Sequence, residues 1–469
     1  MLLGMVQSFV IIRVLTVEEW GIVQLAISIG GALGIYQHLG LASASTREIS
    51  AAKKKEDIFQ IFITSAFIRY CVTLPLALGL FFLAGHIGNN IYNNTQIILP
   101  LKIYAVTLLF QGFQSILNSV ISGTKRFKAL FIYQVVIAVV SVLIYIPFVY
   151  FFKINGFFYA LALFNLISTV TLIFLAFKPL NIPYKMPDKQ DFGKLVKEIF
   201  SISIAIYLIK IIYTNWEKFG GNVLGIFSSV EIVGIYSFAL LYAKKLVNIS
   251  DSVTSVNLPV LSEKFISDLN AFKKLFASNF NKVFVFIVLS GAFASFWAPN
   301  IIRILVGSNK YSASYSLISP MILAFVFYSF INIINSSILI PAKMPRKMIY
   351  SYILMIIGTA AFYFGFRNAI NGISAMAWGM AFGGLLSFLY MVKSIRETLN
   401  FIFWKHDHTL LLFQGFVVSL LCTLDILWVK AVSFIPLAGL TVWAVFITGF
   451  IKKDDIVLIF NKIKKVFAR

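Results

Sequence analysis

"LTVEEWGIVQLA", residues 15–26, returns as "SSVEIVGIYSFA" at residues 228–239. The two stretches lie 213 residues apart and share a Val-Glu pair, a Gly-Ile pair three residues further on and a later Ala. Each also carries a hydroxyl residue three positions before a glutamate, as Thr16-x-x-Glu19 and Ser228-x-x-Glu231. That spacing is typical of a capping box, in which both side chains satisfy free backbone donors at a helix start. The stretch therefore predicts a helix start that occurs twice in the chain.

Two further pairs of motifs support an internal duplication. Asn118-Ser119 and Asn335-Ser336 each precede a basic loop, at an offset of 217 residues. Asn155-Gly156 and Asn371-Gly372 each fall in a turn, at an offset of 216 residues. The pairs agree in order and in predicted membrane side, so we expect two copies of a six-helix unit. Because six is even, both copies point the same way, which is a parallel repeat of the kind used by some alternating-access transporters.

The composition indicates a membrane protein. Of the 469 residues, 59% are apolar and only 12% are charged, and there are 48 Phe residues. Apolar stretches recur at about 20 residues, the length that spans a bilayer as a helix. Helices are the default there, because a segment in lipid must satisfy its own backbone groups. The predicted fold is an all-α polytopic membrane protein of about 14 transmembrane helices: two parallel six-helix repeats plus two C-terminal helices.

The basic residues follow the predicted loops. One set of alternate loops holds 28 of the 40 Lys and Arg residues, the other set holds 5, and 7 lie within spans. Since cytoplasmic loops carry the excess of basic residues, both termini are predicted to be cytoplasmic. The net charge of +22 is then mainly a topology signal. No groove-reading motif is visible, so nucleic acid is not a predicted partner.

The repeat and the loops together predict five parts. They are an N-terminal six-helix bundle (1–177), a cytoplasmic linker (178–198), a C-terminal six-helix bundle (199–392), two additional helices (393–450) and an amphipathic cytoplasmic tail (451–469). In the tail, apolar residues recur at helical spacing among lysines, which is typical of a helix lying on an anionic leaflet.

Three stretches resemble a known family. "VIIRVLTVEEWGIVQLAISI" and "GIFSSVEIVGIYSFALLYAKKLVNISDSVTSVNLPVLSEKF" are similar to the openings of the two halves of polysaccharide flippases in the multidrug/oligosaccharidyl-lipid/polysaccharide exporter superfamily, with Wzx-type O-antigen and capsule flippases nearest. "FKINGFFYALAL" resembles the turn before their sixth span. The resemblance implies a bacterial inner-membrane protein that moves lipid-linked oligosaccharide to the outer leaflet. Membrane lipids, a polysaccharide polymerase and chain-length proteins are the partners it implies.

Seven basic residues fall inside predicted spans: Arg13, Arg69, Lys102, Lys210, Lys244, Lys245 and Arg303. A basic residue at mid-membrane costs about 2.5–3.5 kcal/mol on insertion scales, so such residues indicate a protein interior or a watery cavity. Arg69 and Lys210 are near mid-span, whereas Arg13, Lys102 and Arg303 are near span ends, where long side chains reach the interface. A cationic excess suits a polyprenyl pyrophosphate, which a guanidinium grips bidentately. All seven are therefore candidate substrate-binding residues.

Other polar residues leave alternatives open. Trp216, with Asn215 and Glu217, is a candidate sugar contact, although aromatic residues near a span end are commonly interface anchors. Tyr104, Gln111 and Gln114 line a transport path or pack on neighbouring helices. His406-Asp407-His408 is expected to be a solvated loop rather than a metal site.

Neither a catalytic nor a metal centre is predicted. The chain shows no nucleophile–base pair, phosphate loop or metal-ligand spacing, and its two cysteines lie inside apolar spans, so no enzyme, cofactor or metal is expected. The main alternative is a cation-coupled multidrug exporter of the same superfamily. It would need a membrane carboxylate in the first half, and residues 58–177 contain neither Asp nor Glu.

Overall fold

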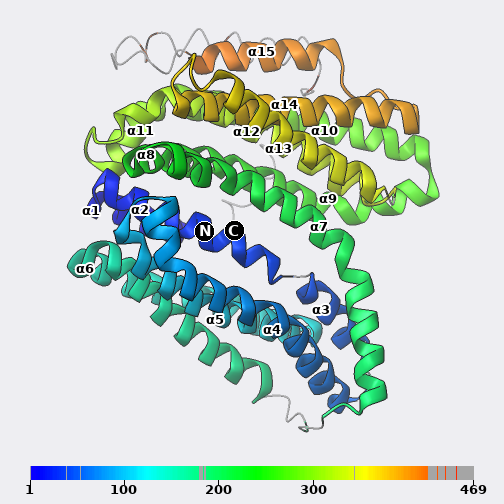
Figure 1. The fold of residues 1–469 in the computed structure, drawn as a ribbon. Helices are drawn as coiled ribbons and strands as arrows, with labels where there is room; N and C mark the ends of the chain where they lie inside the picture. The colour runs from blue at the N-terminus through cyan, green and yellow to red at the C-terminus, as the bar shows by residue number, and fades with distance from the viewer. Residues whose placement is uncertain are drawn as a thin grey trace, which may run out of the picture. The chain divides into compact units, whose positions relative to one another are not determined.

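The computed structural model consists of helices joined by short turns (Figure 1). It describes residues 2–38, 40–52, 54–178, 183, 186–342 and 344–420, with single residues at 430, 432, 439 and 450. Within these ranges there is no strand. The predicted tail (451–469) and most of the last predicted spans lie outside the described residues.

The chain divides into two compact units, Met1–Ser237 and Phe238–Arg469. The helices of the first unit are α1 (Leu2–Val14), α2 (Val17–Tyr36), α3 (Leu41–Ala51), α4 (Lys55–His86), α5 (Ile98–Gly123), α6 (Phe127–Phe177), α7 (Lys189–Phe227) and the first residues of α8 (Val230–Ala243). The second unit holds the rest of α8, then α9 (Val247–Ser267), α10 (Leu269–Phe296), α11 (Ala298–Val306), α12 (Tyr315–Ile334), α13 (Pro345–Phe366), α14 (Gly372–Leu399) and α15 (His406–Leu420).

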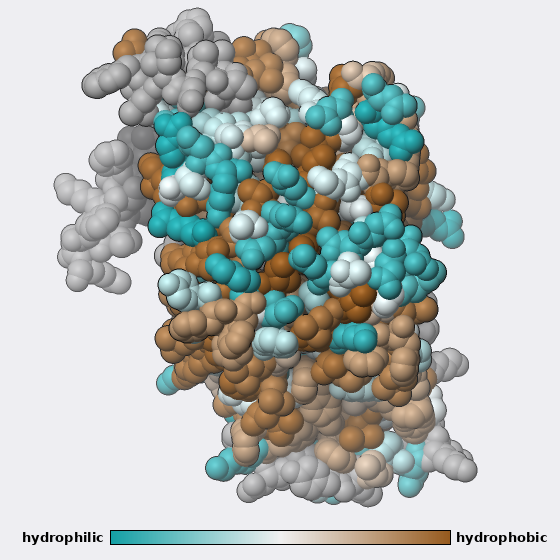
Figure 2. Space-filling view, turned by 60° about the vertical axis from the view of Figure 1, so that its left-hand side comes forward, coloured by the Kyte–Doolittle hydropathy of each residue, from teal (hydrophilic) through white to brown (hydrophobic). Residues whose placement is uncertain are grey.

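The helices have the length and the apolar surface that a bilayer requires. In the described part of the chain, nine are long and apolar enough to cross a membrane. Large apolar side chains are strongly exposed, with Phe82 76%, Phe151 72% and Leu143 67% accessible, and Figure 2 shows broad hydrophobic areas on one face, apart from areas where hydrophilic residues gather. Such exposure is costly in water and normal against lipid. The predicted all-α multi-pass membrane fold is confirmed, while the count of 14 spans stays a prediction.

The two predicted helix starts differ in their caps. At α2 the full capping box is present: the Glu19 amide donates to Thr16 Oγ1 (3.1 Å), and the Thr16 amide donates to Glu19 Oε2 (2.8 Å). At α8 the cap is Ser229, whose Oγ accepts from the Ile232 amide at 3.4 Å. The predicted box from Ser228 to Glu231 is wrong, because the residue at the third helical position is Ile232, which has no acceptor.

The repeated stretches pack against each other at their shared glycines. A Cβ on Gly21 would lie 2.0 Å from the Val230 carbonyl oxygen, and a Cβ on Gly234 would lie 2.3 Å from the Val17 carbonyl oxygen. Glycines at such a crossing let two helix backbones approach closely. The repeated stretch is therefore a packing motif as well as a helix start.

Helix α7 is longer than the sequence indicated. It runs without a break from Lys189 to Phe227 and so includes the second half of the stretch 178–198 that was predicted as a linker. Its polar stretch stays helical: Glu217 and Lys218 form an ion pair at 3.7 Å, and Ser28 of α2 donates to the Lys218 carbonyl oxygen at 3.1 Å. Through such contacts α7 packs in the first unit. The division of the sequence repeat at 178–198 stays a prediction.

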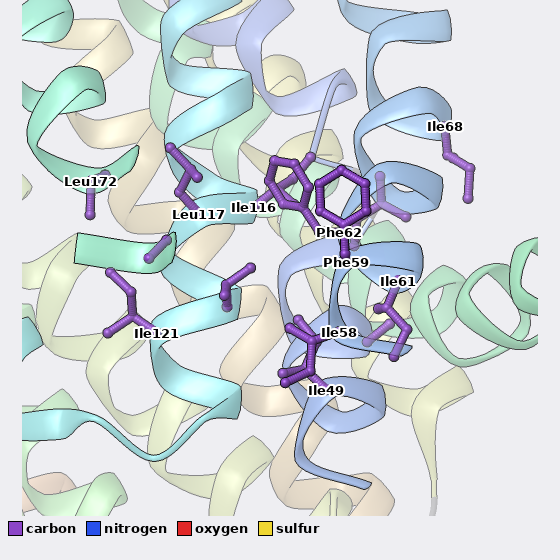
Figure 3. Packing of buried hydrophobic residues seen from close by; sticks show 14 of the residues in the cluster. Ile49, Ile58, Phe59, Ile61, Phe62, Ile68, Ile116, Leu117, Ile121 and Leu172 are labelled. Carbon is purple, nitrogen blue, oxygen red and sulfur yellow. The ribbon is translucent and has the colours of Figure 1, made fainter. Parts of the chain in front are cut away.

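An apolar core joins α3, α4, α5 and α6 of the first unit (Figure 3). Ile49, Phe59, Phe62, Leu117 and Leu172 belong to it, and all are buried. Phe62 of α4 meets Phe113 of α5 edge to face, with ring centroids 5.7 Å apart. This core fixes α4 against α5, and Arg69 and Ser115, described below, lie on these two helices.

The second unit has an aromatic core. Phe272, Phe276, Phe280 and Phe284 recur at every fourth position of α10 and are buried, which forms one continuous stripe on the helix. His408 packs against this stripe and is fully buried.

The predicted solvated loop at His406–His408 is wrong for His408, which lies in the first turn of α15. Its Nδ1 accepts from the Lys405 amide and its Nε2 lies 3.0 Å from Asn281 Oδ1, so the ring is held as the neutral Nε2–H tautomer. Among the described residues no His, Cys, Asp and Glu side chains gather into a metal site.

Candidate substrate site in the N-terminal unit

Arg69 is the centre of a buried polar cluster in the first unit. Its side chain is fully buried on α4, and its Nη1 donates to Ser115 Oγ at 3.3 Å and to the His38 carbonyl oxygen at 3.5 Å. Its Nη2 lies 3.2 Å from His38 Nδ1. Its Nε has no hydrogen-bond partner among the described residues. The partners that the structure gives this guanidinium are all neutral, and their hydrogen bonds are long.

The rest of the cluster is neutral as well. Thr73, one turn further along α4, donates to Gln37 Oε1 at 3.0 Å, and both side chains are buried. A Cβ on Gly112 of α5 would lie 3.2 Å from Gln37 Oε1 and 3.6 Å from Arg69 Nε, so the missing side chain lets α5 approach the guanidinium. In the described part of the chain no carboxylate pairs with Arg69. A net positive charge is left in the interior of the unit.

Lys210 adds to this charge. It projects from α7 and is exposed, and it is close enough to Arg69 for their charges to interact. Two contacts hold this part of α7 at the end of α2: Tyr207 donates to the Tyr36 carbonyl oxygen at 2.7 Å, and Asn215 Nδ2 lies 3.4 Å from the Tyr36 hydroxyl. The structure thus brings together the two basic residues that the sequence placed near mid-span.

A polar groove lies beside the cluster, between α3 and α5. Its volume is about 660 Å³. The lining residues are Ala42, Thr46, Gln111, Gln114, Ser115, Asn118, Ser119 and Ser122. Ser115 belongs to both features, since its hydroxyl lines the groove and accepts a hydrogen bond from Arg69. We refer to this feature below as the α3–α5 groove.

Several groove residues are fixed by the helices behind them. Gln114 Nε2 donates to the Asn165 carbonyl oxygen at 2.9 Å and to Thr169 Oγ1 at 3.0 Å, both on α6. Ser119 donates to the Ala42 carbonyl oxygen at 3.0 Å, which ties α5 to α3. The groove wall is therefore preorganised by the packing of the unit.

Three other predicted residues occupy peripheral positions. Arg13 is exposed in the last turn of α1, and Arg303 is exposed on α11, where its Nε donates to Asn309 Oδ1 at 3.2 Å. Lys102 is half-buried on α5, with its ammonium 5.6 Å from the centre of the Phe81 ring. These positions fit basic side chains that reach the membrane surface.

The remaining predicted residues are a lysine pair of the second unit and a tryptophan of the first. Lys244 and Lys245 form a short 3₁₀ turn between α8 and α9, and both are half-buried in the second unit. Trp216 belongs to the first unit but is fully buried, so its indole offers no surface to a sugar in this conformation.

The α3–α5 groove was only partly visible in the sequence. Gln111 and Gln114 were singled out there as residues that line a path or pack on neighbouring helices; in the structure both line the groove, and Gln114 also bonds to α6. Ser115, Asn118 and Ser122 continue the same face of α5 at helical spacing. This spacing would have predicted the rest of the groove lining from the sequence.

Comparison with solved structures places the fold among transporters. The chain is similar to a lipid II flippase, MurJ, in an inward closed conformation, with 14% identity, a TM-score of 0.70 and 97% of each chain covered. It is also similar to an inward-facing multidrug resistance transporter of the MATE family in the MOP superfamily, with 14% identity, a TM-score of 0.59, and 85% of this chain and 94% of that chain covered. At these identities the likeness shows a shared fold.

Comparison of sequences gives the family. A search of curated proteins finds no match. A family model described as "Polysaccharide biosynthesis protein" matches residues 10–315, which is more than half of the chain. The chain therefore belongs to this polysaccharide biosynthesis protein family.

Proposed function

We propose that this protein is a flippase that moves a polyprenyl-pyrophosphate-linked oligosaccharide from the cytoplasmic to the outer leaflet by alternating access. The observation that carries the proposal is Arg69, a fully buried guanidinium whose hydrogen-bond partners in the described part of the chain are all neutral. Leaving a buried charge uncompensated is costly, and an anionic ligand would compensate it.

A pyrophosphate suits this site in geometry and in charge. A guanidinium presents parallel donors that match two phosphate oxygens, and the nearby Lys210 ammonium supplies a second positive charge. In this conformation Arg69 lies behind the wall of the α3–α5 groove, so binding at Arg69 requires that Ser115 or its neighbours move. A hydrocarbon tail stays in the bilayer while the glycan crosses in the protein.

Family membership favours a glycan as the cargo, because the family is one of polysaccharide biosynthesis. The multidrug exporter is the weaker reading: no acidic residue occurs in residues 58–177, where a first-half coupling carboxylate would be expected. The family resemblance favours a bacterial inner membrane as the location, and the distribution of basic loops favours cytoplasmic termini. A polysaccharide polymerase and chain-length proteins are its proposed partners for O-antigen, capsule or exopolysaccharide synthesis.

The test is deletion of the gene in its own host, followed by complementation with the full chain. We expect lipid-linked oligosaccharide to accumulate on the cytoplasmic leaflet and surface glycan to be lost, with both restored by the wild-type chain. Susceptibility to cationic drugs serves as the control and is expected to stay unchanged. Normal glycan export together with increased drug susceptibility would refute the flippase and support the exporter.

A further inference from the structure

The α3–α5 groove differs in chemistry from the Arg69 cluster behind it. Its lining contains carboxamides and hydroxyls with one Ala, and no charged side chain. A pyrophosphate without its counter-ions would be poorly held there, since phosphate is bound by cations and by converging N–H donors. Neutral carboxamides and hydroxyls instead match a ligand that carries many hydroxyl groups, because each both donates and accepts hydrogen bonds.

Part of the lining is available for a ligand. Asn118 and Ser122 make no side-chain hydrogen bond with any residue that the structure describes, although both line the groove. Ser115 accepts from Arg69 and retains its own hydroxyl proton as a donor. By contrast, Thr46 and Ser119 donate to the Ala42 carbonyl oxygen and shape the wall. The free groups thus lie along one face of α5.

The size and direction of the groove also suit a sugar. Its volume of about 660 Å³ lies within the range of roughly 300–1,000 Å³ found for small-molecule sites. From Gln111 to Ser122 the lining extends over about 16 Å of helix, at about 1.5 Å per residue. Ser122 is near the end of α5 that leads into the basic turn at Lys125 and Arg126, which is the predicted cytoplasmic end. A ligand that enters from the cytoplasm would meet Ser122 and Asn118 before Ser115.

We infer that the α3–α5 groove is a binding site for neutral sugar residues of the glycan, and that it determines which glycan is accepted. The inference rests on the proposed flippase function and extends it. Asn118 and Ser122 bind sugar hydroxyls, and Ser115 connects this subsite to the Arg69 charge that holds the pyrophosphate. The two features are therefore adjacent subsites for one substrate. The Arg69 cluster binds the charged group that all lipid carriers share, and the α3–α5 groove binds the sugar.

The experiment compares two variants against two readouts. Asn118→Leu keeps the approximate size of the side chain and removes its hydrogen bonds, and Ser122→Ala is a milder second variant. The first readout is export of the native glycan in the deletion strain. The second is binding of sugar-free undecaprenyl pyrophosphate to the purified full chain in lipid nanodiscs. Thr107→Val is the matched control, because Thr107 lies on α5 outside the groove and its hydroxyl bonds only to its own helix, at the Tyr104 carbonyl oxygen.

We expect Asn118→Leu to slow export at least tenfold and Ser122→Ala to slow it several-fold, with undecaprenyl pyrophosphate bound as by wild type. Unchanged export in both variants would overturn the sugar site and leave the flippase intact. Loss of undecaprenyl pyrophosphate binding along with export would also overturn it, since the groove would then act on the whole site. Failure of the wild-type chain to bind undecaprenyl pyrophosphate would instead refute the proposed function itself.

Discussion

Replacing Arg69 with Gln should separate function from stability. The variant loses three hydrogen bonds, at 3.2, 3.3 and 3.5 Å. Charge-assisted N–H···O bonds are typically about 2.7–2.9 Å long, so these are weak, and we assign each roughly 0.5 kcal/mol, at the low end for hydrogen bonds. The variant also removes a buried charge that costs about 2.5–3.5 kcal/mol at mid-membrane. The free energy of unfolding should therefore stay within about 1 kcal/mol of wild type, or rise.

Substrate binding, unlike stability, should be strongly weakened by this substitution. Removing one partner of a buried, hydrogen-bonded charge pair costs about 2–5 kcal/mol. Since about 1.4 kcal/mol corresponds to a tenfold change in affinity, Arg69→Gln should weaken pyrophosphate binding by about 30-fold or more. Glycan export should fall with it, because the charge compensation that draws the carrier lipid into the interior is lost.

Both quantities are measurable on the full chain in lipid nanodiscs. Thermal unfolding followed by intrinsic tryptophan fluorescence reports stability, and titration with undecaprenyl pyrophosphate reports affinity. Arg367→Gln is the matched control, since Arg367 lies directly after α13 against the Phe364 ring, outside the Arg69 cluster. Wild-type affinity in Arg69→Gln would refute the pyrophosphate site. A loss of more than about 3 kcal/mol of stability would show instead that Arg69 is a structural residue, because the balance above excludes such a loss.

Three further predictions concern the fold. Thr16→Ala should lower stability by about 0.5–2 kcal/mol, measured by thermal unfolding, because it removes the cap that Thr16 forms with Glu19. Gly21→Val should prevent α2 from packing against α8, since its Cβ would lie 2.0 Å from the Val230 carbonyl oxygen. The loss of the folded chain would be seen as loss of the monodisperse peak in size-exclusion chromatography. Burial lowers the pKa of His408 from 6.5 to about 4. Between these pH values the unfolded chain binds a proton at His408 more readily than the folded chain does, so the stability of the wild type should fall as the pH drops from 6.5 towards 4. His408→Gln should not show this decline.

The sequence predicted the features that follow from local chemistry. The cap at Thr16 was predictable because both partners lie within four residues, and the multi-pass helical fold followed from apolar length alone. The repeat was also visible, but the role of Gly21 and Gly234 was not, because a close approach between two helices has no local sequence signature. What the sequence did show was that the same residue types recurred in the same order.

The errors have physical causes. The sequence placed a span end near Trp216 because the chain becomes polar at Glu217 and Lys218, yet α7 continues to Phe227, and Ser28 of α2 donates to the Lys218 carbonyl oxygen. His408 was predicted to be solvated because it stands in a polar stretch, whereas here the phenylalanines of α10 enclose it and Asn281 satisfies its Nε2. In each case a distant partner, which no local pattern reveals, decided the outcome.

The two corresponding helices α4 and α10 show why we assign the substrate chemistry to the first unit. Helix α4 follows α2 and α3, and α10 follows α8 and α9, where α2 and α8 contain the two copies of the repeated stretch. The buried side chains of α4 and α10 nevertheless differ. The buried residues of α4 include Thr64, Ser65, Arg69 and Thr73, whereas the stripe of α10 consists of Phe272, Phe276, Phe280 and Phe284. An interior of hydroxyls around an unpaired cation tolerates water and an anionic ligand, because each group can exchange its partner. An interior of interlocked aromatic rings gains its stability from excluding both. We therefore assign the polar substrate to the first of the two predicted repeats and a dry, structural role to the second.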